Sequence, residues 1–113
     1  MASELAGKVE KLLQEAFPHY LIKKEYFVLY NGYKLFFDFY LPELLVAVEA
    51  QGGQHDKFVE HFHGDGFNFR AHKKRDKAKR EWALENKVTL IEIRDKDFPM
   101  SVSNLIDTIS DGK

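Results

Sequence analysis

The sequence predicts a single α/β domain over residues 1–113, in which helices flank a mixed four-stranded sheet. The expected element order is αβββαβ, followed by a C-terminal helix. Three observations predict this fold: helical apolar spacing near the N-terminus, an Asn-Gly hairpin signal between two strand-like runs, and a long polar helix that precedes a short apolar strand. With 113 residues and 44% hydrophobic content, the chain is large enough for one buried core.

The first half of the chain predicts one helix and three strands. Residues 3–17 have apolar side chains at helical spacing, with Ser3 as the expected N-cap. Residues 20–30 and 33–41 are expected strands, because the Asn-Gly pair between them is a strong two-residue hairpin signal. Residues 44–51 form the expected third strand. The second and third strands are apolar on both faces, which predicts positions inside the sheet.

The second half predicts two helices and one strand. A short helix followed by a loop is expected over residues 54–66, and a longer helix over 67–86. Residues 88–93 form the fourth strand, and a closing helix over 101–110 has Ser101 as its expected cap. Because a long helix separates the third and fourth strands, they are expected to pair in parallel through a crossover.

Composition excludes several classes of protein. The chain has no cysteine, so it has no disulfides, no thiolate zinc site and no cysteine nucleophile. No apolar run is long enough to cross a bilayer, and the N-terminus does not have the pattern of a signal peptide. We therefore expect a cytoplasmic protein that does not bind membranes.

Two carboxylates stand in otherwise apolar strands. Asp38 lies in the second predicted strand and Glu49 in the third. Burying a lone carboxylate costs roughly several kcal/mol unless it is paired or binds a metal, so two on adjacent strands predict a cation between them. Magnesium prefers such oxygen ligands, and the Ala50 carbonyl is the expected third. The alternative is that a lysine or arginine neutralises both acids.

The residues that follow Glu49 suit phosphate chemistry. Gln51 shares the face of Glu49 and could orient a water molecule or a phosphate oxygen. After Gly52-Gly53 comes His55, a side chain suited to proton transfer near neutral pH. A zinc site built from His55, His61, His63 and Asp56 is the alternative, but it would leave the two strand carboxylates unexplained.

Residues 73–80, KKRDKAKR, hold six cations and one aspartate in eight positions, although the whole chain has a net charge of −1. Such a block predicts contacts with nucleic-acid phosphates, and its alternative is a solvated helix face. Within it, Asp76 and Lys79 share a helix face with His72. The predicted phosphate-binding residues are Lys73, Lys74, Arg75, Lys79 and Arg80.

The element order and these motifs resemble the PD-(D/E)XK nuclease superfamily. FDFYLPELLVAVEAQGGQH is similar to its strand-turn-strand metal motif, with Asp38 as the motif aspartate and Glu49-Ala50-Gln51 in place of the (D/E)-X-K triplet. Gln51 replaces the triplet lysine, which is a departure from the pattern. His55 and Asp76 resemble the EDxHD pattern of the very-short-patch-repair-like (Vsr-like) branch, and phage-encoded homing endonucleases carry catalytic domains of this kind.

The resemblance implies a restriction-endonuclease-like fold and a Mg²⁺-dependent endodeoxyribonuclease, with Mn²⁺ as an alternative cation. It implies that Asp38, Glu49 and the Ala50 carbonyl hold the metal, that His55 is the general base, and that Gln51 positions the water or the phosphate. Asp76 and the first acid of the pattern would orient His55 or bind the metal through water. That first acid is assigned to Glu4 at the helix start; its rivals are Glu10 and Glu15.

Double-stranded DNA is the expected partner. Because only one block of the chain is basic, a homodimer partner or a DNA-targeting region in a longer protein is expected to supply most of the affinity. The resemblance implies the cytoplasm of a bacterium or of a phage-infected host. A non-catalytic nucleic-acid-binding module is the alternative function, and RNA or branched DNA stay open as substrates.

Overall fold

The computed structural model describes residues 4–51 and 66–112, and side chains of the second range from residue 74 onward. Its elements follow the predicted order, so the α/β fold class is confirmed. One short 3-10 helix, η1, was not predicted from the sequence. The elements are α1 (Glu4–Ala16), β1 (Lys23–Tyr30), β2 (Tyr33–Leu41), β3 (Val46–Gln51), α3 (Gly66–Glu85), β4 (Thr89–Arg94), η1 (Asp95–Asp97) and α4 (Val102–Gly112).

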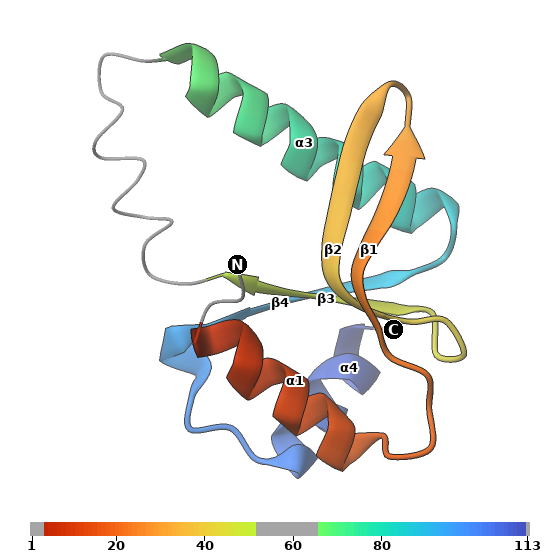
Figure 1. The fold of residues 1–113 in the computed structure, drawn as a ribbon, viewed down its shortest axis with the longest axis vertical. Helices are drawn as coiled ribbons and strands as arrows, with labels where there is room; N and C mark the ends of the chain where they lie inside the picture. The colour runs from red at the N-terminus through yellow and green to blue at the C-terminus, as the bar shows by residue number, and fades with distance from the viewer. Residues whose placement is uncertain (1–3, 52–65, 113) are drawn as a thin grey trace.

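The four strands form one mixed sheet in the order β1-β2-β3-β4. β1 pairs antiparallel with β2, and β2 pairs antiparallel with β3. β3 and β4 run parallel, because α3 carries the chain back over the sheet between them (Figure 1). The predictions of interior positions for β2 and β3 and of a parallel crossover are both confirmed.

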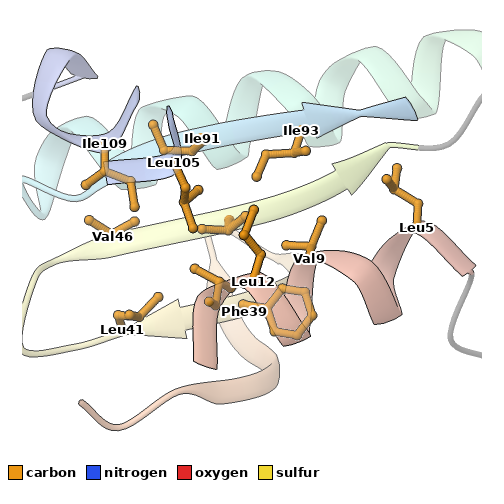
Figure 2. Close-up of a cluster of buried hydrophobic side chains, with 12 residues drawn as sticks. Leu5, Val9, Leu12, Phe39, Leu41, Val46, Ile91, Ile93, Leu105 and Ile109 are labelled. Carbon is orange, nitrogen blue, oxygen red and sulfur yellow. The ribbon is translucent and has the colours of Figure 1, made fainter. Parts of the chain in front are cut away.

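Helices cover the sheet on both faces. α1 and α4 lie on one face and α3 crosses the other (Figure 1). The face under α1 and α4 holds a purely apolar cluster, to which β3 contributes Val46 and Val48 (Figure 2). The α3 face holds a second cluster around Phe37 and Ala47, with aromatic side chains at its edge. Successive residues of β3 therefore alternate between the two layers.

Strand β2 changes face at Asp38. Phe37 packs in the α3 cluster, whereas Phe39 packs in the cluster under α1, although residues two apart on a flat strand share a face. On the partner strand β1, Glu25 has a left-handed backbone with φ of 50°. The β1–β2 hairpin consequently curves out of the plane of β3 and β4 and rises beside α3 (Figure 1). Phe36, two residues before Asp38 on the same strand, is 55% exposed.

Local signals account for the turns and caps. Asn31 and Gly32 have positive φ of 49° and 82°, the conformation that a two-residue hairpin turn requires. The Ser101 hydroxyl accepts a hydrogen bond from the Asn104 N–H at 3.1 Å, which confirms the predicted cap of α4. Ser3 and the helix-and-loop predicted over 54–66 fall outside the described residues, save for residue 66, where α3 begins. No helix in the described part of the chain is long and apolar enough to span a membrane.

Candidate functional site

Asp38 and Glu49 meet at the point where β2 leaves β3. The two strands pair up to Phe39 and Val48, and Asp38 and Glu49 are the next residues in this register. The Asp38 carboxylate accepts a hydrogen bond from the Ala50 N–H at 2.7 Å. This bond ties the Asp38 side chain to β3 beside Glu49, and the Asp38 backbone lies near enough to the Glu49 carboxylate to influence its pKa.

Glu49 is the buried charged residue of the described chain, with 8% of its surface exposed. Burial raises the pKa of the Glu49 carboxyl above its usual range, and the neighbouring Asp38 charge raises it further. The Lys79 ammonium and the hydrogen bond from the Asp38 backbone lower that pKa again, but burial prevails. The site therefore carries a carboxylate whose ionised form needs a nearby cation.

In this structure Lys79 supplies that positive charge. Its Nζ donates to Glu49 Oε1 in a mostly buried ion pair, and it lies 5.4 Å from the centre of the Phe37 ring. The expected alternative, neutralisation by a basic side chain, is thus realised for Glu49. Lys79 was predicted to contact phosphates together with the basic block, but here it points toward the sheet.

The rest of the basic block lies along α3. The side chains of Lys74, Arg75 and Arg80 are exposed, and Asp76 is half-buried one turn before Lys79. On the predicted shared face of these two residues, Lys79 contacts Glu49 at the strand end, and Asp76 lies one turn away along the helix. Lys73 lies on the same helix, directly before the exposed residues Lys74 and Arg75.

The remaining predicted site residues lie at the ends of elements. Gln51 is the last residue of β3 and pairs in register with Arg94 of β4. Glu4 begins α1, and Figure 2 places its neighbour Leu5 beside the end of β3. Its rival Glu10 is bonded to Lys24 of β1 at 3.1 Å. The assignment of the first acid to Glu4 stays a prediction, with Glu15 as its other rival.

Sequence reasoning passed over Glu92. The parallel register pairs it with Glu49, so Asp38, Glu49 and Glu92 lie on three neighbouring strands, and Glu92 also lies 3.8 Å from Arg94. The signal was present in the sequence, because VTLIEI is a third apolar strand with a single carboxylate. The criterion that singled out Asp38 and Glu49 also applies to this strand.

The donor set suits a hard divalent cation in its chemistry. Carboxylate oxygens of Asp38 and Glu49 are ligands that Mg²⁺ prefers, and a cation beside them would relieve the charge that raises the pKa of Glu49. Within residues 4–51 and 66–112, no group of three His, Cys, Asp or Glu side chains is arranged to hold a metal. His55 and the alternative zinc ligands His61, His63 and Asp56 lie outside the described residues.

Comparison with known proteins found one informative similarity. The chain is 43% identical over 77 residues to "Uncharacterized protein 307L" of Invertebrate iridescent virus 6. The match covers 66% of this chain and 39% of the viral protein, so the chain corresponds to well under half of that protein's length. No family model matches the chain, and no solved structure matches it.

Proposed function

We propose that this domain is a metal-dependent DNA endonuclease that hydrolyses phosphodiester bonds. The observation that carries the proposal is the convergence of Asp38 and Glu49, which come from adjacent strands and lie under the basic helix α3. Two acids need not share a site for stability, since an apolar pair would avoid the cost of burying Glu49. A cation-binding role explains why both carboxylates are kept together beside an exposed basic surface.

Asp38, Glu49 and the Ala50 carbonyl would hold the metal, Mg²⁺ or Mn²⁺. When bound, it supplies a Lewis acid that polarises the phosphate and lowers the pKa of a bound water. The chain's own residues do the rest. Gln51, at the end of β3, orients the water or a phosphate oxygen through its amide, and His55 accepts the water's proton. Glu4 and Asp76 orient His55, and the product would carry a 5′-phosphate.

Lys79 has two states in this proposal. Without metal it neutralises Glu49, as the structure shows for the ion pair. With a bound cation neutralising Glu49, the Lys79 ammonium would be available to bind a phosphate oxygen beside the site. Lys73, Lys74, Arg75 and Arg80 would grip the flanking backbone of double-stranded DNA.

Affinity and location belong to the same proposal. One basic helix can contact only a few DNA phosphates, so a second copy of the chain or a DNA-targeting region would supply most of the binding energy. The proposed location is the cytoplasm of a bacterium or of a phage-infected host, whereas the similar protein belongs to Invertebrate iridescent virus 6.

A second function is favoured by the Lys79–Glu49 ion pair. A carboxylate that is already neutralised by a lysine is also what a non-catalytic nucleic-acid-binding module would show. The two functions differ in one measurement. The module binds DNA in the presence of a chelator and yields no nicked product after magnesium is added.

The test of catalysis is the nicking of supercoiled plasmid by the parent protein and by Asp38→Asn, with Mg²⁺ or with chelator. The asparagine keeps an oxygen that can accept the Ala50 N–H, so the fold should persist while a metal ligand loses its charge. We expect nicking by the parent with Mg²⁺ only, and none by Asp38→Asn. Asp107→Asn, at an exposed position of α4, is the matched control and should cleave normally. Full activity of Asp38→Asn would remove the metal site.

His55 provides a separate test of the acid–base step. Removing a general base lowers a rate by roughly 10²–10⁴-fold, so His55→Ala should nick plasmid that much more slowly at unchanged DNA affinity. Single-turnover rates on a labelled duplex measure the effect. A variant that cleaves at the parent rate would show that His55 has no part in the chemistry.

A further inference from the structure

A second feature of the α3 face lies away from the two acids. An open pocket of about 290 Å³ lies between the tip of the β1–β2 hairpin and α3. Tyr30, Asn31 and Tyr33 line it from the hairpin, and Lys74, Lys77 and Glu81 line it from the helix. Neither Asp38 nor Glu49 borders it, so it is not part of the candidate metal site.

Local structure explains how these side chains meet. The tight turn at Asn31 and Gly32 makes Tyr30 and Tyr33 direct partners in the β1–β2 register. On α3, positions 74, 77 and 81 lie on one helical face by steps of three and four. The buried Ala78 lies on that same face and lets the hairpin approach the helix closely. The result is two aromatic rings across from two ammonium groups.

The pocket offers two ammonium groups to an anion, next to the Glu81 carboxylate that also lines it. Lys74 is exposed, and Lys77 pairs with Glu81 at 3.9 Å in an exposed ion pair. Such a pair contributes only about 0–1 kcal/mol, so a phosphate can displace the carboxylate at little cost. The neighbouring Glu85 carboxylate raises the pKa of the Tyr30 phenol.

We propose that this pocket binds one unpaired nucleotide of a nucleic-acid strand. The base lies against the rings of Tyr30 and Tyr33, and Lys74 and Lys77 bind the adjoining phosphate. Aromatic side chains stack on any base, because every base has a π-face, and lysines beside them track the backbone. The volume lies near the lower end of the usual range for ligand pockets, roughly 300–1,000 Å³, which suits a single nucleotide and excludes a duplex.

The position of the pocket bears on the substrate, and this step depends on the proposed nuclease function. Tyr33 and Asp38 lie five residues apart on β2, a distance of at most ~17 Å along a strand. A strand whose unpaired nucleotide occupies the pocket can therefore reach the two acids. The substrate class we infer is DNA with a single-stranded segment beside the cut, such as a flap or a branch.

The test compares two probes of equal charge, a fluorescein-labelled oligomer of eight thymidines and the same oligomer without bases. Fluorescence anisotropy with the full chain, in EDTA, measures both affinities. The parent should prefer the thymidine oligomer. Tyr33→Ala should weaken its binding roughly 5- to 150-fold and leave the abasic oligomer unaffected, because only the stacking is lost. Tyr33→Phe should retain the preference, and Lys74→Ala should weaken both probes.

Phe36→Ala is the matched control, since Phe36 is an exposed aromatic residue on the same strand but does not line the pocket. Its affinities should equal those of the parent. Equal affinities of the parent for the two probes, or equal losses on both in Tyr33→Ala, would overturn the proposal. The binding assay does not depend on cleavage. If the parent prefers the thymidine oligomer but never nicks plasmid, the proposed nuclease function is wrong and the proposed pocket stands. If the parent nicks duplex DNA but shows no preference for the thymidine oligomer, the proposed pocket is wrong and the nuclease function stands.

Discussion

The two faces of the sheet differ in chemistry, although the same strands build both. Under α1 and α4 the buried cluster is entirely apolar, whereas the α3 face holds Glu49, Lys79 and a set of tilted aromatic rings around Trp82. Alternation along β3 assigns Val46 and Val48 to the first face and Ala47 and Glu49 to the second. One face can therefore supply stability while the other tolerates a costly buried charge.

The aromatic rings show how the second face is held together. Tyr26 and Tyr40 stack with ring centroids 4.5 Å apart, and Phe37 lies 5.0 Å from Trp82 of α3. Such pairs contribute about 0.5–1.5 kcal/mol beyond the area that they bury. These contacts fix α3 over the curved hairpin, and this in turn positions Lys79 above Glu49.

The largest expected effect is a loss of stability from a cavity on the apolar face. Leu13 of α1 is fully buried, so Leu13→Ala should lower the free energy of unfolding by about 2–5 kcal/mol. Urea denaturation measures it. Leu84→Ala removes the same atoms from a side chain that is 82% exposed and should change stability by less than about 0.5 kcal/mol. Similar losses from both variants would contradict the assignment of the core.

An intermediate effect is expected from the ion pair on the α3 face. Lys79→Met keeps the length of the side chain but leaves the buried Glu49 without its cation, which should cost about 1–3 kcal/mol at neutral pH. The control is Lys77→Met, whose exposed pair with Glu81 should contribute nearly nothing. The double variant Glu49→Gln/Lys79→Met should recover part of the loss. If Lys79→Met is as stable as Lys77→Met, the pair contributes no more than a surface contact.

Most of the fold could be predicted from the sequence, because its signals are local. The Asn31-Gly32 turn, the Ser101 cap and the helical spacing in α1 each depend on a few adjacent residues, and each appears as expected. The bend at Asp38 could not be predicted. It arises because the hairpin must pack its aromatic side chains on α3, a contact between segments that are distant in sequence.

The candidate site was predictable in part for the same reason. Lone carboxylates in apolar strands single out Asp38 and Glu49 from the sequence, and the same rule would have found Glu92. The Lys79–Glu49 contact joins residues thirty positions apart. Helical spacing places Lys79 on one face with His72 and Asp76, but it does not indicate which part of the sheet that face meets. The pocket at the hairpin tip is likewise visible only once the curvature of β2 is known.

The smallest expected effect is a pH dependence that separates burial from ion pairing at Glu49. Because the pKa of the Glu49 carboxyl is raised in the folded protein, the unfolded chain loses the Glu49 proton at lower pH, from about 4.5 upward. Between the pKa of the unfolded chain and that of the folded protein, the folded state binds more protons. The contribution of Glu49 to the free energy of unfolding is therefore complete at low pH and is lost as pH rises through the raised pKa. Glu49→Gln cannot titrate. Its free energy of unfolding in EDTA, minus that of the parent, should therefore increase from pH 4 to pH 7.

The sign of that change decides which interaction dominates at the site. If Lys79 outweighed burial, the pKa of Glu49 would be lowered, and the difference between Glu49→Gln and the parent would decrease with pH instead. Leu84→Ala should keep a constant offset from the parent over the same range, because its exposed side chain is apolar. An increasing difference means that Glu49 stays short of positive charge even with Lys79 in place. A divalent cation would then bind where the lysine alone does not satisfy the acid.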